Sequence, residues 1–217
     1  MPLDRPEKNG AGRPQAAPAG VVAALRAATA GRHAVVDRTT PLAVPAPGLS
    51  HYRSHLLLLQ AWLTPLQEWL ADFRDGPQAC AALPEPDRLA ALAQDLADLD
   101  AREIAAAPGL IRPGVMDAPL LPRNADAAWR WGICYVIEGS QLGGAVLSKD
   151  LAQRYPGCPL RYLSGNGRLP GPRWHAFMDA IGEQVREQED IEAACRGACA
   201  AFDRLLALMP PPTKCPS

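Results

Sequence analysis

The sequence predicts an all-α protein with a single domain. Apolar residues recur three or four positions apart in several long stretches, which is the period of a helix that buries one face. No stretch of useful length alternates between apolar and polar residues, and no internal repeat is present. At 217 residues the chain is long enough for one hydrophobic core. Together these observations favour a helical bundle.

The two ends of the chain differ in composition from its centre. Residues 1–19 are rich in Pro, Gly, Ala and charged side chains, with almost nothing to bury, and are predicted to be a disordered tail. Residues 20–209 carry the helical pattern and form the predicted domain. Residues 210–217 are expected to be a flexible C-terminal tail.

The first two helices are predicted from periodicity and capping signals. One begins near residue 21 and ends near residues 39–42. Its inner face is built from residues at helical spacing: Val22, Leu25, Thr29, His33 and Val36. The second is expected over residues 50–73, with Ser50 as N-cap and a kink at Pro65.

A third helix is predicted over residues 86–106, with Pro86 in its first turn. Residues 107–124 are interrupted by Pro and Gly and are expected to be irregular, with Asn124 capping the next helix.

That fourth helix is expected to run to residues 154–157 and to be followed by a loop. Pro172 then suits the first turn of a last helical region, 172–209, with a break near residues 188–190.

The composition excludes several classes of function. Lys and Arg number 22 against 23 Asp and Glu, so no basic excess points to nucleic acid or a membrane surface. No apolar run approaches the roughly 18 residues of a membrane span, and the N-terminus has no apolar core of a signal peptide. The six cysteines are scattered, and we expect free thiols in a cytoplasmic protein. Cys158 and Cys215 each precede Pro, a two-residue pattern also seen in haem-responsive segments.

A glycine cluster stands out in "YVIEGSQLGGAVL", residues 135–147. Gly139, Ser140, Gly143 and Gly144 fall within six positions of one predicted helix. Each glycine in a helix interior costs about 1 kcal/mol relative to alanine, so the missing side chains need a reason. No nucleotide-binding glycine motif is present. The smooth face fits either another helix or a flat ligand.

His33 lies on the apolar face of the first predicted helix. Asp37, one turn later, can accept a hydrogen bond from Nδ1 of His33. The Nε2 of His33 then stays free as an acceptor or metal ligand. The alternative is a core histidine satisfied by its own helix. His51 and His55 are also one turn apart, but the nearby leucines favour histidines at a helix start over a metal pair.

Two segments resemble the haem oxygenase family. "LRAATAGRHAVVD", residues 25–37, is similar to the proximal helix of that family, and "YVIEGSQLGGAVLSKDLAQRY" is similar to its glycine-bearing distal helix. The loop "YLSGNGRLPGPRW" and the final segment "AAFDRLLALM" extend the resemblance over residues 21–209. It is strongest to bacterial members found beside bacteriophytochromes.

The resemblance implies a haem-oxygenase-like helical bundle with haem between the two helices. His33 would be the iron ligand, oriented by Asp37, and Gly139, Ser140 and Gly143 would form the catalytic wall on the other side of the haem. Basic side chains would hold the propionates. The full implied set of cofactor-binding residues is Arg26, Thr29, His33, Asp37, Gly139, Gly143, Gly144, Lys149, Arg173 and His175.

The implied reaction opens haem to biliverdin, carbon monoxide and ferrous iron, so haem is both cofactor and substrate. Electrons would come from an external donor, a ferredoxin or a flavoprotein reductase, and a photoreceptor could accept the bilin. Ser140 departs from animal-type members, which carry an aspartate there. This departure leaves a non-catalytic haem carrier or sensor as an alternative, and a helical module that binds no haem as a third.

Overall fold

The computed structural model describes residues 20–84, 86–110, 120–165 and 170–210. Six α-helices and one short 3-10 helix occur in these residues, and no strand does, which confirms the all-α prediction. The elements are α1 (Val21–Thr39), α2 (Leu49–Leu70), η1 (Gly76–Ala79), α3 (Arg88–Ala101), α4 (Ala127–Arg154), α5 (Pro170–Gln184) and α6 (Gln188–Leu208). The predicted N-terminal tail, residues 1–19, lies outside the described residues, and so does the predicted C-terminal tail apart from residue 210.

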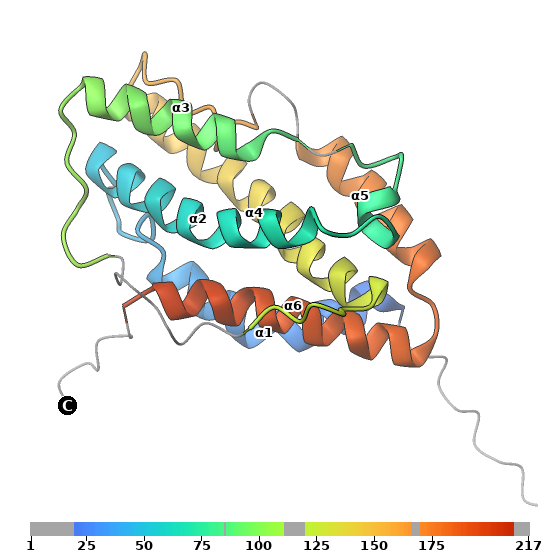
Figure 1. Ribbon diagram of the computed structural model, residues 1–217. Coiled ribbons are helices and arrows are strands. Elements are labelled where there is room, and N and C mark those ends of the chain that lie inside the picture. The colour runs from blue at the N-terminus through green and yellow to red at the C-terminus, as the bar shows by residue number, and fades with distance from the viewer. Residues whose placement is uncertain (1–19, 85, 111–119, 166–169, 211–217) are drawn as a thin grey trace, which may run out of the picture.

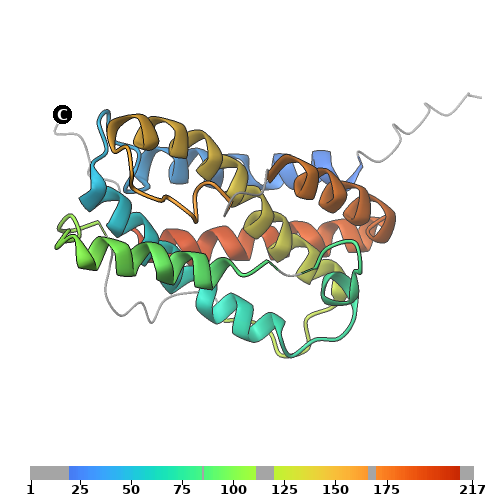
Figure 2. The same cartoon turned by 90° about the horizontal axis from the view of Figure 1, so that it is seen from above.

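The longest helix, α4, runs through the middle of the bundle. In Figure 1, α1 and α6 lie side by side beneath it, and the two helices are in extensive contact. Seen from above, α4 passes obliquely between α1 and α5 on one side and α2 and α3 on the other (Figure 2). Helix α4, which carries the glycine cluster, packs most extensively on α6 and also contacts α5 and η1.

The core is continuous around α4 and is made mainly of leucine and aromatic side chains. Trp62 of α2 is buried and donates from Nε1 to the Ala201 carbonyl oxygen of α6 at 2.9 Å. Tyr52 of α2 is also buried and donates to Asp95 of α3 at 2.6 Å. These bonds satisfy the polar atoms of two large side chains that would otherwise cost free energy in the core.

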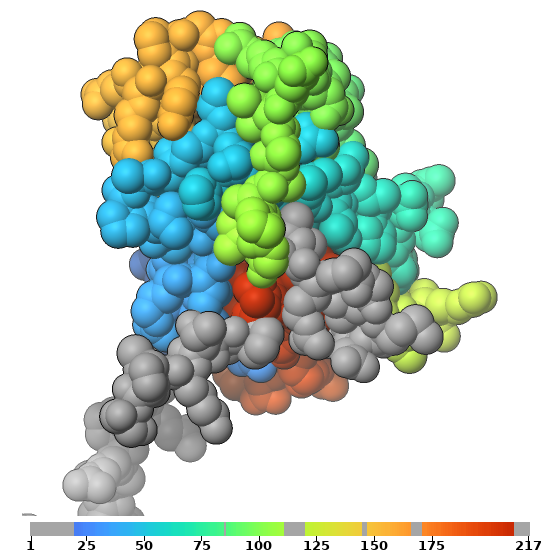
Figure 3. Space-filling model, turned by 90° about the vertical axis from the view of Figure 1, so that its left-hand side faces the viewer, coloured from blue at the N-terminus to red at the C-terminus, as the bar shows by residue number. Residues whose placement is uncertain are grey.

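The start of α2 is covered by the segment after α3. In Figure 3 this segment runs from α3 across the face of α2 toward α6. The Ala107 amide donates to the Ser50 carbonyl oxygen at 3.2 Å, and Ser54 Oγ donates to the Ala107 carbonyl oxygen at 3.3 Å. The predicted irregular conformation is confirmed for the described part, residues 107–110 and 120–124.

The first helix matches its prediction, whereas the start of the second was predicted wrongly. Gly48, not Ser50, is the N-cap of α2, and the His51 side chain accepts the Gly48 amide at Nδ1 over 3.2 Å. The imidazole of His51 therefore gives the Gly48 amide a hydrogen-bond partner, which it would lack if the helix began at Ser50. The helix continues through Pro65 and ends at Leu70, three residues earlier than expected.

The predicted start of α3 and the predicted cap of α4 were also wrong. Pro86 lies before α3 and not in its first turn; the N-cap is Asp87, which accepts the Ala90 amide at 3.0 Å. Asp126, not Asn124, caps α4 by accepting the Trp129 amide at 2.6 Å. In both cases a carboxylate lies directly before the helix and accepts a hydrogen bond from an otherwise unpaired amide. Its negative charge is also stabilised by the positive end of the helix dipole.

The last helical region is broken at residues 185–187, slightly before the expected position. Glu189 and Asp190 lie in the first turn of α6, because acidic side chains are stabilising at a helix N-terminus. The short η1 element was not predicted. The chain's helices include none with the length and apolar character of a membrane span, within the residues that the structure describes.

Candidate functional site

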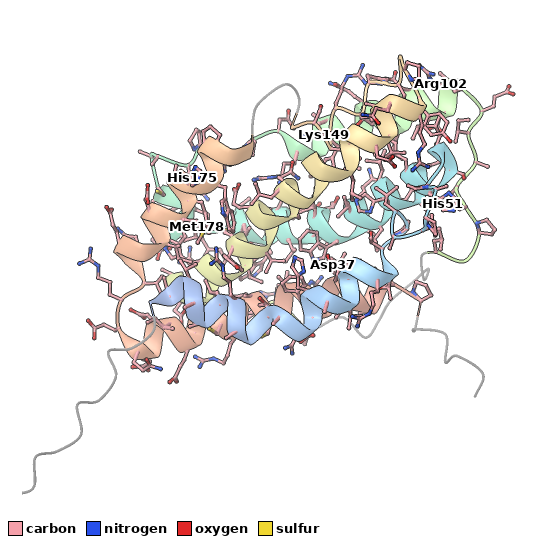
Figure 4. The ribbon with its side chains drawn as sticks, turned by 180° about the vertical axis from the view of Figure 1, so that it is seen from behind. Asp37, His51, Arg102, Lys149, His175 and Met178 are labelled. Atoms are coloured by element: carbon pink, nitrogen blue, oxygen red, sulfur yellow. The ribbon has the colours of Figure 1, made fainter. Side chains whose placement is uncertain are left out.

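A cavity of about 330 Å³ lies between α1, α2, α4 and α6. Helix α1 contributes Thr29, His33 and Asp37, and α4 contributes Gly139, Ser140 and Gly143. The remaining wall is largely apolar, with side chains from α2 and α6 that include Leu58, Trp62, Phe202 and Leu205. Figure 4 shows Asp37 on α1, at the gap between α1 and α4. The two segments singled out in the sequence therefore face the same cavity.

His33 and Asp37 form the hydrogen bond expected from their spacing. Nδ1 of His33 lies 2.8 Å from Oδ2 of Asp37, across one turn of α1. The His33 ring also meets the Phe202 ring edge-on, with centroids 6.0 Å apart. Because Nδ1 is engaged by the carboxylate, Nε2 is the ring nitrogen left for a ligand. Both side chains are more than 60 % exposed, so the imidazole is not a core histidine.

The three glycines of the cluster meet different surroundings. A Cβ atom added to Gly139 would lie 3.6 Å from the Trp174 ring, and one on Gly144 would lie 3.2 Å from Leu163 Cδ2. A Cβ added to Gly143 would meet no atom within 4 Å. Gly139 and Gly144 thus combine cavity lining with protein packing, whereas the space beside Gly143 is open.

Two hydroxyl groups in the cavity wall donate to their own helices. Ser140 Oγ donates to the Ile137 carbonyl oxygen at 2.7 Å, and buried Thr29 Oγ1 donates to the Leu25 carbonyl oxygen at 2.7 Å. Each hydroxyl proton is therefore used within the helix. The Ser140 oxygen keeps lone pairs that can accept a further hydrogen bond.

The basic residues predicted to contact the haem propionates differ in their relation to the cavity wall. Arg26 is exposed on α1 and interacts with the hydroxyl of Tyr135, a cavity residue whose pKa is raised by burial and lowered in part by Arg26. Lys149 and His175 are exposed and do not line the cavity (Figure 4). Arg26 is thus the predicted cation with a direct link to a cavity residue.

Arg173 is held in an ion pair at the junction of α3, α4 and α5. Its Nε and Nη2 donate to the two carboxylate oxygens of Glu138 at 2.8 and 2.7 Å, and Nη1 donates to the Pro84 carbonyl oxygen at 2.7 Å. Arg88 lies 2.7 Å from the same carboxylate. Arg173 lines a separate cavity of about 530 Å³ rather than the one that contains His33.

Sequence reasoning missed a second imidazole in the cavity. His55 of α2 lines it, and its Nδ1 lies 2.9 Å from Thr40 Oγ1. Burial lowers the pKa of His55 to about 4, so the ring is neutral near neutral pH. His51 accepts the Gly48 amide at the start of α2, in line with the expectation of a histidine at a helix start. The helical spacing of the pair gave no signal of these separate roles.

Tyr162 was also missed, because it comes from the segment between α4 and α5 and has no helical period to place it. It is 3 % exposed and lines the cavity beside Ser140.

Among the described residues, no group of three or more His, Cys, Asp or Glu side chains is arranged to hold a metal ion. Burial raises the pKa of the thiols of Cys195 and Cys199.

These residues fit a flat, iron-containing ligand on structural grounds. One wall offers a single imidazole held by a carboxylate, another offers a glycine with open space beside it, and the rest is mostly apolar. A single histidine on one face is one of the common ways in which proteins hold haem iron, and a glycine on the other wall leaves room for the flat ring. The fold and the site thus define an all-α protein with a histidine-bearing cavity beside a glycine-rich helix.

The chain belongs to the heme oxygenase family. The family model described as heme oxygenase matches residues 19–209. A curated heme oxygenase of Xanthomonas campestris pv. campestris (strain 8004) is 36% identical over 89 residues, which are 40% of this chain and 53% of the relative. The match to that curated relative therefore spans about half of its length. No solved structure matches the chain significantly.

Proposed function

We propose that the protein binds haem in this cavity and opens it oxidatively to biliverdin, carbon monoxide and ferrous iron. The observation that carries the proposal is the His33–Asp37 pair in the same cavity as Gly143. The family match and the curated heme oxygenase relative support it. The cavity wall is mostly apolar, which suits burial of a porphyrin face.

His33 would hold the iron through Nε2. The Asp37 carboxylate accepts from Nδ1, which fixes the tautomer and the direction of the ring. Bound haem supplies redox-active iron and is itself the molecule that is oxidised. The chain's own task is then to orient the ring, exclude bulk water and control protons.

The other predicted site residues have supporting roles in this proposal. Gly143 leaves room for close contact between the α4 backbone and the porphyrin, and Ser140 can accept a hydrogen bond from water. Arg26 is suited to a propionate, because its guanidinium lies at Tyr135 on the cavity wall. Lys149, Arg173 and His175 complete the set of propionate contacts predicted from the sequence.

The reaction needs dioxygen and electrons that the chain does not supply. A ferredoxin or a flavoprotein reductase would deliver the electrons, and the products would leave as free bilin, carbon monoxide and iron. The resemblance to bacteriophytochrome-associated members supports a photoreceptor as bilin acceptor. We place the reaction in the cytoplasm, where reduced cofactors and free thiols are maintained.

The test is spectroscopic. Haemin added to the purified protein should give a sharp Soret band, which should collapse into biliverdin absorption when a reductant and oxygen are supplied, with catalase present to remove free peroxide. A Soret band that persists under these conditions would favour the haem carrier or sensor. That alternative draws support from Ser140, whose proton is already donated to Ile137. Absence of any Soret band would exclude both haem-dependent functions.

A further inference from the structure

The α4–α5 segment, residues 155–165, packs on the glycine-bearing stretch of α4. A Cβ atom added to Gly144 would lie 3.2 Å from Leu163 Cδ2 and 3.6 Å from both the Cα atom and the carbonyl oxygen of Leu163. Leu163 and its neighbour Tyr162 are buried, and both line the cavity that contains His33. The segment therefore contacts α4 and forms part of the cavity wall at the same place.

Tyr162 extends this contact by one turn of α4. Its phenol lies close to the side chains of Ser140 and Gln141, which offset part of the rise that burial causes in the pKa of Tyr162. Together with the contact at Gly144, the segment thus meets α4 over residues 140–144.

One buried carboxylate on α3 holds this segment in place. Asp95 is 1 % exposed, and its Oδ2 accepts the Tyr162 amide at 2.9 Å and the Tyr52 hydroxyl at 2.6 Å. Its Oδ1 accepts from Nη1 of Arg161 at 3.2 Å. Asp95 therefore binds two consecutive residues of the segment, directly before Leu163. A buried carboxylate is stable only with such partners, so the cluster favours one arrangement of the backbone.

The segment depends on such contacts because its described residues form no helix or strand of their own. Asp95 itself does not line the cavity. Any effect of this carboxylate on a ligand in the cavity must therefore act through Tyr162 and Leu163.

We propose that Asp95 is a positioning residue for the haem cavity: it holds Tyr162 and Leu163 against α4 and so sets where the glycine-bearing wall lies relative to His33. This inference rests on the proposed function. The ring carbon that is oxidised depends on how the haem plane is oriented in the cavity. Asp95 therefore contributes to the position at which the ring opens, although it does not touch the haem.

Asp95→Asn tests this anchor with little change of shape. If the amide oxygen replaces Oδ2, the amide NH₂ group faces the guanidinium of Arg161, donor against donor. In the flipped orientation the NH₂ group faces the Tyr162 amide, and that hydrogen bond is lost. Either orientation removes one of the two bonds that hold the segment.

Two variants serve as controls. Asp98→Asn makes the same chemical change on the same helix, in a partly exposed carboxylate that pairs with Arg161. Val185→Ala lowers stability at a buried position that lines neither cavity.

The first test uses the haem-free protein and does not depend on the proposed function. Amide hydrogen exchange is compared at urea concentrations that give wild type and each variant the same global stability. Exchange in residues 139–147 should be about tenfold faster in Asp95→Asn than in wild type, because local opening of this stretch then breaks fewer contacts. Asp98→Asn and Val185→Ala should match wild type there. Equal exchange in Asp95→Asn and Val185→Ala would overturn the anchor.

If Asp95→Asn fails to fold, Leu163→Ala tests the same contact from its other end. This variant keeps the carboxylate and its partners but removes the side chain that meets Gly144. Exchange in residues 139–147 should again be faster at matched stability, and unchanged exchange would overturn the anchor.

The second test uses turnover of added haemin with a reductant, oxygen and catalase, followed by chromatography of the biliverdin isomers. In Asp95→Asn the share of minor isomers should rise about twofold or more, because the haem is held less uniquely. Asp98→Asn and Val185→Ala should keep the wild-type proportions, since a loss of stability alone does not change where the ring opens.

Wild-type isomer proportions in Asp95→Asn would overturn the role toward haem, even if exchange in α4 is faster. A wild-type protein that forms no biliverdin would instead refute the proposed function and, with it, that role. The exchange comparison would still decide whether Asp95 holds the segment against α4.

Discussion

Gly132 of α4 and Gly197 of α6 each lie against the backbone of the facing helix where the two helices pack together. A Cβ atom on Gly132 would lie 1.9 Å from the Ala194 carbonyl oxygen, and one on Gly197 would lie 2.0 Å from the Trp129 carbonyl oxygen. Both separations are far below any tolerable contact. The closest approach of another helix to α4 is therefore met by Gly132, before the glycine cluster begins.

Alanine at either of these glycines should push α4 and α6 apart. We expect Gly132→Ala and Gly197→Ala each to lower the free energy of unfolding by about 3 kcal/mol or more, measured by urea denaturation. Gly182→Ala is the control, because a Cβ there meets no atom within 4 Å in an exposed part of α5. It should raise the free energy of unfolding by up to about 1 kcal/mol. Similar stability of Gly132→Ala and Gly182→Ala would contradict the close packing.

Gly143→Ala should separate stability from haem binding. Since no atom lies within 4 Å of the added Cβ, the haem-free protein should gain up to about 1 kcal/mol from the better helix former. The same methyl group should disturb haem on the α4 side, seen as a changed Soret position or a weaker affinity. Gly182→Ala should give the stability gain without the spectral change. An unaltered haem spectrum in Gly143→Ala would argue against a porphyrin beside α4.

The two imidazoles of the cavity can be distinguished by substitution. His33→Ala should change the ferric haem spectrum, because it removes the nitrogen proposed to hold the iron, and added imidazole should restore a histidine-like spectrum. Asp37→Asn should keep the ligand but alter the spectrum slightly, since the amide is a weaker acceptor for Nδ1. His55→Gln should retain the wild-type ligand signature. The reverse pattern, with His55→Gln losing the ligand, would assign the iron to α2.

His55 should make the fold sensitive to mild acid. Its folded pKa of about 4 lies below the ordinary value of 6.5, so the unfolded chain takes up a proton that the folded protein resists. Its contribution to stability is complete above pH 6.5 and is lost as the pH falls toward 4, by about 3 kcal/mol at most. Urea midpoints at pH 7.5 and 4.5 should therefore differ less in His55→Gln than in wild type. His175→Gln, at an exposed position, should leave that difference unchanged.

Arg173→Met should weaken the junction of α3, α4 and α5. Glu138 is 8 % exposed and would lose the Arg173 guanidinium while keeping that of Arg88. We therefore expect the free energy of unfolding to fall by about 1–3 kcal/mol. Arg26→Met, at an exposed position, should change it little. Titration with haemin then tests the propionate contact predicted for each arginine, as a loss of affinity beyond any loss of stability. Unchanged stability of Arg173→Met would contradict a structural role for the ion pair.

The helices were largely predictable, but several of their ends were not. The apolar period placed α1 within a residue of its bounds, because burial of one face repeats along the chain. The caps at Asp87 and Asp126 were missed in favour of neighbouring residues, although an aspartate before a helix is a recognisable signal. The Gly48–His51 bond at the start of α2 is the N3-to-N-cap half of a capping box, but histidine takes the place of the usual Glu or Gln, so the pattern was not recognised.

The sequence alone determined the all-α class, the His33–Asp37 hydrogen bond and the presence of a glycine-rich face on α4. Each of these depends on residues within a few positions of one another, so helical spacing suffices to specify it. Only the tertiary structure decided that Gly132 meets α6, that Arg173 pairs with Glu138, and that His55 and Tyr162 enter the cavity. Those contacts join distant segments, and their geometry follows from how the helices pack around α4, which no local period encodes.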